Sequence, residues 1–447
     1  MTTPQSNPAD IPPDKPKQLS LGVIFLTLYI DLIGFSIIFP LFPSILDYYL
    51  GKEGSSGLLG TILSFLDQIS QWLGSGDNFT LVLFGGFLGS LYSLFQFIFA
   101  PIWGGLSDRL GRRGILLCTV FGTAISYLIW AVSGSFLLLI LARLLGGMMS
   151  GNLSVATAAV ADVTSKKNRA KGMGLIGAAF GLGFVTGPAI GGYFSGFNLL
   201  NAHPELARLG INPFSIPAFI AFGLSVLNLV WIYRRFTESL PPEKRAKPEP
   251  FASRSPLKRL GANHPLPVKT TNKVYFIFLL AFSGMEFTLS FLTVDRFSFG
   301  PREITWMFIF IGAVLIITQG GIVRRLVPAI GEKKTAFIGL CMTTFGFFIL
   351  SYAPTIKFLY SGLAIMGMGS GLTTASLTAL VSLYSSEETQ GKSLGSFRSY
   401  GSLARVIGPI AASILFWWFG SHFSYALGAL LMIIPATIAL RLPSPDK

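Results

Sequence analysis

The sequence predicts an all-α membrane protein with twelve transmembrane helices in two six-helix pseudo-repeats, and with both termini in the cytoplasm. The first observation is composition: the 447 residues are 51% hydrophobic and only 12% charged, whereas soluble domains carry about 25% charged residues. The second is a series of long apolar segments, and the third is the distribution of Lys and Arg between the loops. Together they exclude an ordinary soluble domain.

Twelve apolar segments approach or exceed the ~20 residues that a helix needs to cross a bilayer. They span residues 19–46, 79–103, 115–132, 136–161, 172–194, 214–233, 274–294, 304–323, 335–353, 358–384, 394–419 and 423–439.

The loops between these segments differ in positive charge. With the N-terminus inside, the cytoplasmic segments hold 27 of the 34 Lys and Arg residues, and the outer loops hold five. Such a bias places the basic loops in the cytoplasm. The formal charge of +14 is therefore explained by topology, and no nucleic-acid partner is expected.

Composition also divides the chain into five parts. Residues 1–18 are polar and rich in proline, with no apolar core, so we expect a disordered cytoplasmic leader and not a signal peptide. Residues 19–233 form the predicted N-terminal six-helix bundle, and residues 274–440 the C-terminal one. Between them, the basic and proline-rich residues 234–273 read as a cytoplasmic linker. Residues 441–447 would be a cytoplasmic tail.

The two halves share short sequence patterns. The run 104–110, GGLSDRL, has a counterpart in 320–326, GGIVRRL, and the pair Gly187-Pro188 has one in Gly408-Pro409. Parallel repeats of six helices place a substrate site between the halves, near the middle of the membrane.

The segment 104–114, GGLSDRLGRRG, carries four charges between two apolar segments, so it should form a short solvent-facing turn. Its pattern resembles the signature loop of the major facilitator superfamily, and the resemblance extends over essentially the whole chain. It implies the major facilitator fold and a transporter that works by alternating access. A glycine-rich stretch in the fifth segment, 181–192, resembles a motif of antiporters in that superfamily. The expected conformational gate comprises Gly105, Asp108, Arg109, Gly111, Arg112, Arg113, Asp162, Gly183, Gly187 and Pro188.

Four charged residues lie well inside apolar segments, away from their ends: Asp31, Arg143, Glu286 and Arg405. Ionisable groups in a membrane are costly, and they usually mark substrate or proton pathways. The pattern around Asp31, with Gly34, Pro40 and Pro43, resembles the first span of drug/proton antiporters, including tetracycline exporters. The alternative for Asp31 is a permanent structural ion pair.

Arg143, with Gly147, resembles an Arg-x-x-x-Gly motif that implies proton coupling, and its alternative is a structural counter-ion for Asp31. Glu286 lies in the seventh segment, the counterpart of the first, and is a candidate for proton binding or for contact with a cationic group. Its alternative is a helix–helix hydrogen bond. Arg405 suits an anionic substrate, or else a salt bridge to Glu286 or Asp31.

The runs 282–299, 318–334 and 395–409 narrow the resemblance to the tetracycline-transporter-like organic-anion exporters of animals. This implies efflux of amphipathic organic anions, with Arg405 and Arg398 as anion contacts. We therefore predict a proton-coupled exporter of amphipathic organic compounds, in which Asp31, Arg143 and Glu286 couple protons and Arg405, Glu286, Asp31 and Arg398 bind substrate. The alternatives are a facilitator or proton symporter of a metabolite anion, and a transport-dead sensor or scaffold.

The sequence lacks the motifs of enzymes and of metal or cofactor sites. It has no Walker motif and no catalytic triad, and its two cysteines, Cys118 and Cys341, and three histidines show no metal-ligand spacing. We expect no enzyme activity, no metal and no cofactor, with the proton gradient as the energy source. The expected partners are a small amphipathic substrate, protons and lipid, and the expected state is a monomer. We expect a multi-pass protein of the plasma membrane, and the short tails and the lack of a convincing glycosylation loop favour a bacterial inner membrane.

Overall fold

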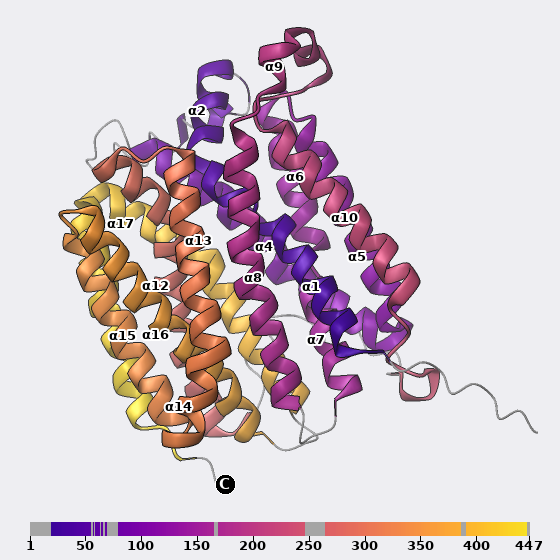
Figure 1. The fold of residues 1–447 in the computed structure, drawn as a ribbon, viewed down its shortest axis with the longest axis vertical. Helices are drawn as coiled ribbons and strands as arrows, with labels where there is room; N and C mark the ends of the chain where they lie inside the picture. Colours follow the sequence, from indigo (N-terminus) through magenta and orange to yellow (C-terminus); the bar gives the residue numbers. More distant parts are fainter. Residues whose placement is uncertain are drawn as a thin grey trace, which may run out of the picture.

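The computed structural model describes residues 19–245, apart from 55, 56, 58, 63, 66, 67, 69–78 and 165–168, together with 264–385 and 390–444. Within these ranges every regular element is a helix, and the long helices run roughly side by side (Figure 1). Nine helical stretches of the described residues are long and apolar enough to cross a membrane. The predicted all-helical membrane fold is confirmed, and the number of twelve spans stays a prediction. The leader 1–18 lies outside the described residues.

We call the part before the linker the N-half and the part after it the C-half. The N-half contains α1 (Leu21–Ser36), η1 (Phe39–Leu41), α2 (Phe42–Glu53), α4 (Phe79–Leu110), α5 (Arg112–Ala131), α6 (Phe136–Met149), α7 (Asn152–Val163), α8 (Arg169–Ser195), α9 (Leu199–Ala202), η3 (Pro204–Leu209) and α10 (Ser215–Arg235). After η4 (Pro242–Lys244), the C-half contains α12 (Leu266–Phe297), α13 (Pro301–Ile317), the π-helical turn η6 (Thr318–Ile322), α14 (Val323–Ile330), α15 (Glu332–Tyr352), α16 (Ile356–Leu383) and α17 (Gln390–Leu440).

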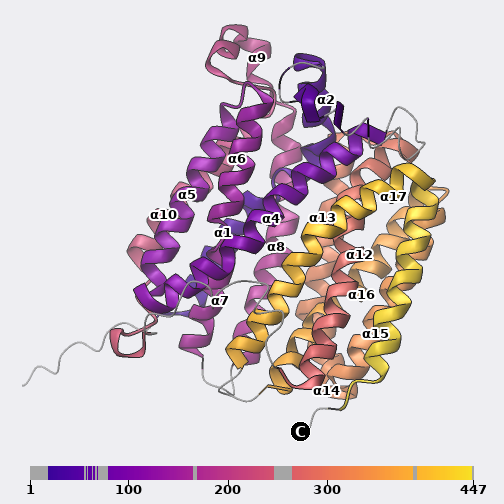
Figure 2. The ribbon, with the colours of Figure 1, turned by 180° about the vertical axis from the view of Figure 1, so that it is seen from behind.

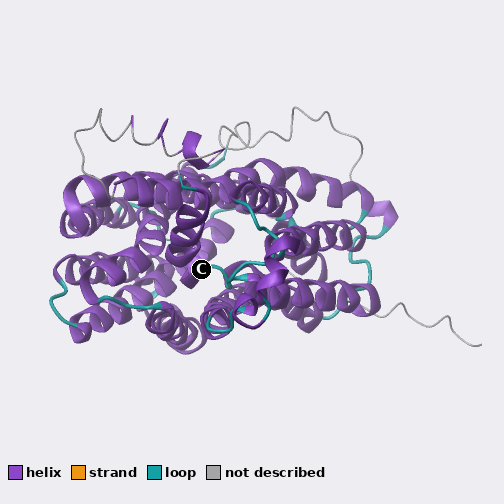
Figure 3. Ribbon diagram, turned by 90° about the horizontal axis from the view of Figure 1, so that it is seen from above, coloured by secondary structure: helices purple, strands orange, loops and turns teal. Residues whose placement is uncertain are grey.

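The two ends of the bundle carry different elements. Helices α2 and α9 lie at one end, which we call the α2 face, whereas α14 and the C-terminus lie at the opposite end, which we call the linker face (Figure 1, and from behind in Figure 2). Viewed along the helices, the bundle forms two groups side by side (Figure 3). One buried apolar cluster belongs to the C-half and two belong to the N-half. Each half therefore has its own core.

Helix boundaries differ from the sequence-based segments in places where polar residues continue a helix. Helix α12 begins at Leu266, earlier than the expected residue 274, because its first turns carry the polar sequence LPVKTTNK. Helix α4 continues to Leu110, so the signature segment is mostly helical, with Gly111 alone between α4 and α5. Gly111 has a φ of 101°, which glycine adopts readily. The eleventh and twelfth segments are joined in α17, where Gly420 breaks the helical geometry.

The fourth segment is interrupted in the middle. Helix α6 ends at Met149 and α7 begins at Asn152. The Ser150 hydroxyl donates to the Gly147 carbonyl at 2.7 Å, and the Trp103 indole N–H donates to the Met148 carbonyl at 2.6 Å. A side chain at Gly151 would overlap the Trp103 ring. The Trp103 ring of α4 therefore occupies the gap between α6 and α7, and its N–H satisfies the Met148 carbonyl there.

The repeated Gly-Pro pairs occupy matching positions in the two halves. Gly187 lies against α1, and Gly408 lies against α12, too closely for a side chain at either place. Ser36 of α1 donates to the Gly183 carbonyl at 2.9 Å, and Ser283 of α12 donates to the Ala404 carbonyl at 3.3 Å. Each accepting carbonyl lies one helical turn before its Gly-Pro glycine. The close contacts thus pair the first and fifth spans of each half.

The halves meet along two pairs of helices, α4 with α17 and α8 with α13. At the α2 face, aromatic rings join them. Phe39 lies 6.4 Å from Phe308, and Phe42 lies 5.8 Å from Phe287, measured between ring centroids. Among the described residues, these are the two aromatic pairs that cross from one half to the other.

Candidate functional site

A cavity lies between the halves, next to these aromatic pairs. Its empty space, part of it open to solvent, is about 670 Å³. Both halves contribute to it. The lining residues are Phe35, Phe39, Phe42, Tyr92, Ser93 and Arg143 of the N-half, and Ser283, Glu286, Phe287, Ser290, Phe308, Arg405 and Pro409 of the C-half.

Aromatic rings form much of the wall. Phe35 lies 5.2 Å from the Tyr92 ring and 5.3 Å from the Phe39 ring, and the pairs described above continue the wall into the C-half. Such rings offer a large apolar surface to a bound ring or chain. The cavity therefore suits a molecule with a substantial apolar part.

Glu286 of α12 and Arg405 of α17 both line this cavity. Among the described residues, no salt bridge joins Arg405 to Glu286 or to Asp31. The Arg405 charge acts on Glu286, but no direct ion pair between described residues occupies its guanidinium. A guanidinium in this position is available to an anion, because its donors match carboxylate and sulfonate oxygens.

Arg398 lies two turns before Arg405 on α17. It is half-buried, but it does not line the cavity. The neighbouring Phe397 ring stacks on Tyr275 at 3.9 Å between centroids. The role of Arg398 as an anion contact stays a prediction.

Arg143 of α6 is 7% exposed and reaches the cavity from the N-half. Its guanidinium carbon lies 5.7 Å from the Tyr92 ring centroid and 5.6 Å from that of Trp130. Its Nε is buried and has no hydrogen-bond partner in the described part of the chain. No salt bridge joins it to Asp31 there, so the aromatic faces, and not a carboxylate, surround this cation.

Asp31 of α1 is instead bonded to Asn152, the first residue of α7. The Asn152 amide nitrogen donates to a carboxylate oxygen of Asp31 at 2.7 Å. Asn152 is 1% exposed, and its amide oxygen is buried with no partner among the described residues. Sequence reasoning missed Asn152. The available signal was that it is the single amide residue in the fourth apolar segment.

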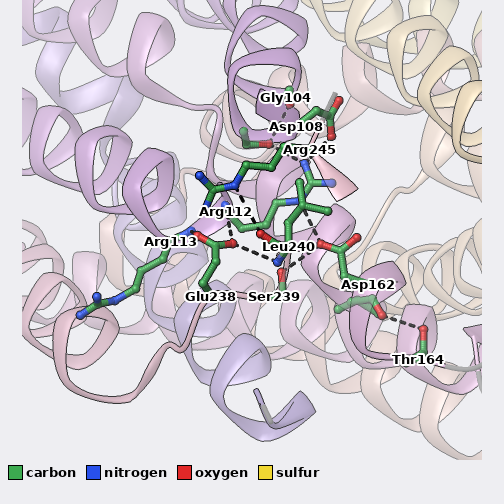
Figure 4. A network of polar contacts seen from close by, with 12 residues as sticks. Gly104, Asp108, Arg112, Arg113, Asp162, Thr164, Glu238, Ser239, Leu240 and Arg245 are labelled. Carbon is green, nitrogen blue, oxygen red and sulfur yellow. Dashed lines mark hydrogen bonds and ion pairs between the residues drawn. The ribbon is translucent and has the colours of Figure 1, made fainter. Parts of the chain in front are cut away.

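The expected gate residues form two groups. Gly183, Gly187 and Pro188 lie on α8, where Gly183 and Gly187 pack against α1 within the N-half. The charged group lies at the linker face and is centred on Arg112, whose side chain is 7% exposed (Figure 4). Arg112 forms an ion pair with Asp108, bonds Asp162 at 3.0 Å and donates to Ser107 at 2.7 Å.

Arg113 and Arg109 differ from Arg112. Arg113 donates to the Tyr233 carbonyl at 2.6 Å, whereas Arg109 has no hydrogen bond or ion pair within the described ranges. Gly105 is buried in α4. Among the described residues, every hydrogen-bond and ion-pair partner of Arg112 and Arg113 belongs to the N-half or to the start of the linker. A latch across the two halves therefore stays a prediction.

The start of the linker adds Glu238, which sequence reasoning also missed. Its carboxylate accepts the backbone N–H of Arg112 at 2.8 Å and that of Arg113 at 3.2 Å, at the first turn of α5 (Figure 4). Ser239 donates to Asp162 at 2.9 Å. A carboxylate at a helix N-terminus accepts from free N–H groups and interacts favourably with the helix dipole. Residues 238 and 239 thus tie the linker to the signature segment.

Substitution of Glu238 by alanine should loosen the first turn of α5. Loss of a capping side chain costs about 1 kcal/mol, which corresponds to about fivefold faster opening at 25 °C. Hydrogen exchange at the Arg112 and Arg113 amides should accelerate by that factor. Glu243→Ala is the matched control, because its exposed carboxylate has no partner among the described residues. Equal exchange in both variants would contradict the capping role.

The arrangement defines a class of protein: a helical membrane transporter with a substrate cavity between two similar halves. The chain belongs to the Major Facilitator Superfamily, whose sequence profile matches residues 24–329 and 322–447. Members of this superfamily are transporters and not enzymes, and they use no cofactor.

Particular relatives narrow the class. The chain is 35% identical to the bovine (Bos taurus) major facilitator superfamily domain-containing protein 10, over 97% of this chain and 94% of that protein. It is 26% identical to the class H tetracycline resistance protein of Pasteurella multocida, over 95% and 98%. Among solved structures, it resembles the human organic anion transporter MFSD10 (TETRAN), with a TM-score of 0.78 and 32% identity over 94% of this chain and 98% of that one.

Proposed function

We propose that the chain exports amphipathic organic anions by proton-coupled alternating access. The observation that carries the proposal is the cavity itself, in which aromatic walls surround Arg405 and Glu286. The aromatic part would hold the apolar body of the substrate, and Arg405 its anionic group. The relative described as an organic anion transporter supports this substrate class, and the tetracycline resistance relatives support export.

The facing of the cavity fits the first step of export. Rings from both halves are in contact at the α2 face, so we infer that this face is closed and that substrate enters from the linker face. The basic loops at that end indicate the cytoplasm. We also propose that the protein is a monomer in the plasma membrane.

Asp31 and Glu286 would carry the protons. The amide of Asn152 can serve both forms of Asp31, because an amide donates through its nitrogen and accepts through its oxygen. Its nitrogen now bonds the carboxylate and its oxygen is unused. Rotation of the amide would let it accept the proton of a neutral Asp31. Proton and substrate would then favour different facings of the cavity.

Purified protein in liposomes loaded with a pH-sensitive dye tests the proposal. Aromatic monocarboxylates should drive proton flux in the wild type, whereas Asp31→Asn and Glu286→Gln should reduce that flux by about tenfold or more, because each removes an ionisable group from the membrane interior. Arg405→Ala should remove the response to anions. Glu205→Gln is the matched control, because Glu205 is an exposed acid at the start of η3 that is paired with His203.

Two results would contradict the proposal in different ways. Anion transport without proton movement, unaffected by both acid substitutions, would replace it with a facilitator. Transport of organic cations with no response to anions would reject the substrate class.

A further inference from the structure

The surroundings of Arg143 indicate a role other than proton coupling. It is the second guanidinium of the cavity, and it enters from the half opposite to Arg405. It is more than nine-tenths buried, its Nε has no partner, and no carboxylate pairs with it among the described residues. Leaving a buried charge uncompensated is expensive. The rings of Tyr92 and Trp130 offset part of this cost through cation–π contacts.

Neither Asp31 nor Glu286 forms a salt bridge with Arg143 in the described part of the chain. Asp31 accepts the amide of Asn152. Glu286 lines the cavity from the C-half, without a salt bridge to either arginine. The cavity therefore presents two guanidiniums and one carboxylate to its contents. A ligand with a single anionic group meets the donors of one guanidinium, whereas a ligand with two anionic groups can meet the donors of both, one from each half.

We propose that Arg143 is a second anion-binding residue, and that the preferred substrates are aromatic or amphipathic dianions whose two anionic groups bind Arg143 and Arg405. Such a ligand bridges the N-half and the C-half. Its apolar body lies against the aromatic wall that includes Phe35 and Tyr92. This assignment rests on the proposed function, because it uses the same cavity and the same contact with Arg405.

A bridging ligand also has a consequence for the transport cycle. The two arginines belong to bodies that have separate cores, so the substrate couples them directly. Binding then favours the conformation in which both contacts are made over those in which one is broken. A monoanion lacks this second contact and should shift the conformations less.

A matched pair of ligands tests the assignment. 2-Naphthoate and naphthalene-2,6-dicarboxylate share one ring system and differ by one carboxylate. Binding is measured by titration calorimetry with the full-length protein in detergent, for the wild type, Arg143→Met, Arg143→Lys and Arg405→Met. A charge-assisted hydrogen bond contributes about 1.5–3 kcal/mol, so the wild type should bind the dicarboxylate at least about tenfold more tightly.

The expected result for Arg143→Met is a dicarboxylate preference that falls to about one, with the larger loss on the dicarboxylate. Arg143→Lys keeps the charge without the planar fork, and it should retain an intermediate preference. Arg405→Met should weaken both ligands. Thermal melting and gel filtration of each variant confirm that it is folded.

The outcomes separate this inference from the proposed function. If Arg143→Met weakens both ligands equally, or if Arg143→Lys behaves as Arg143→Met does, the residue does not bind the second anionic group. If binding of both ligands is unchanged and substrate-driven proton flux is lost, Arg143 belongs to proton coupling, as its motif implies. If neither ligand binds the wild type, or Arg405→Met has no effect, the proposed function itself fails.

Discussion

Replacing Gly192 by leucine is expected to hold the cavity open at the α2 face and to abolish transport. Gly192 lies near the end of α8, and Thr305 lies near the start of α13 in the other half. A β-carbon at Gly192 would overlap the Thr305 side chain. The contact exists when the α2 face is closed, as we infer it to be here, and must separate when that face opens. A bulky side chain therefore opposes one of the two facings that the cycle needs.

The size of the effect follows from the closeness of the contact. Inserting extra methylene groups into a packed interface costs about 1–3 kcal/mol and sometimes more. A cost of about 3 kcal/mol, applied to the closed state alone, shifts the conformational equilibrium by roughly 140-fold toward the state open at the α2 face. Gly192→Ala should act in the same direction with a smaller shift. Gly192→Leu should abolish transport because the protein rarely returns to the state closed at that face.

Labelling of a cavity cysteine measures this shift. Ser290 lines the cavity and is 3% exposed, so Ser290→Cys in a background without Cys118 and Cys341 reports access. An impermeant maleimide applied to the α2 face should label it in Gly192→Leu and only slowly in the parent. Gly223→Leu is the control, because a β-carbon at Gly223 meets no atom within 4 Å. If Gly192→Leu transports normally and its labelling is unchanged, the contact between Gly192 and Thr305 plays no part in the transport cycle.

Close helix contacts at the two Gly-Pro pairs could be predicted from the sequence, whereas the partners, α1 for α8 and α12 for α17, are seen only in the structure. The Gly-Pro pairs recur at matching points, and glycine is what allows two helices to approach closely in a membrane. Arg405, Glu286 and Arg143 could be placed near the cavity for a similar reason. Charged residues in apolar segments must face a polar interior, and the structure brings these three to one cavity.

The contacts of Asp31 could not be predicted because they depend on another helix. The interruption before Asn152 coincides with the Trp103 ring, which lies far away in the sequence. Residues 148–151, MMSG, carry no charge and no proline, so the pattern alone favours one unbroken helix. Glu238 was missed for the same reason. A charged residue in a proline-rich linker looks solvated until the first turn of α5 is seen beside it.

Replacing Arg112 by alanine is expected to cause the largest loss of stability at the linker face. Its guanidinium joins three helices by contacting Asp108 of α4 and Asp162 of α7 from the start of α5. Breaking a buried ion pair by removing one partner costs about 3–5 kcal/mol. The Asp108 side chain is 48% exposed, and solvent screens such a partner, so we expect a loss of about 2 kcal/mol. Arg112→Lys should recover little of it, because an ammonium group lacks the fork that reaches several acceptors.

A double-mutant cycle with Asp162 isolates the pairwise contribution. Thermal unfolding in detergent would compare Arg112→Ala, Asp162→Asn and the double variant, with an interaction energy of about 1 kcal/mol or more expected between the two sites. Arg109→Ala is the matched control, because it removes a neighbouring arginine that has no ion pair among the described residues. If the two single effects simply add, or if Arg109→Ala destabilises as much, the stability of this face comes from helix packing and the charge cluster contributes little. A measured coupling would mean that the linker, bound to Asp162 through Ser239, can influence the stability of the signature segment.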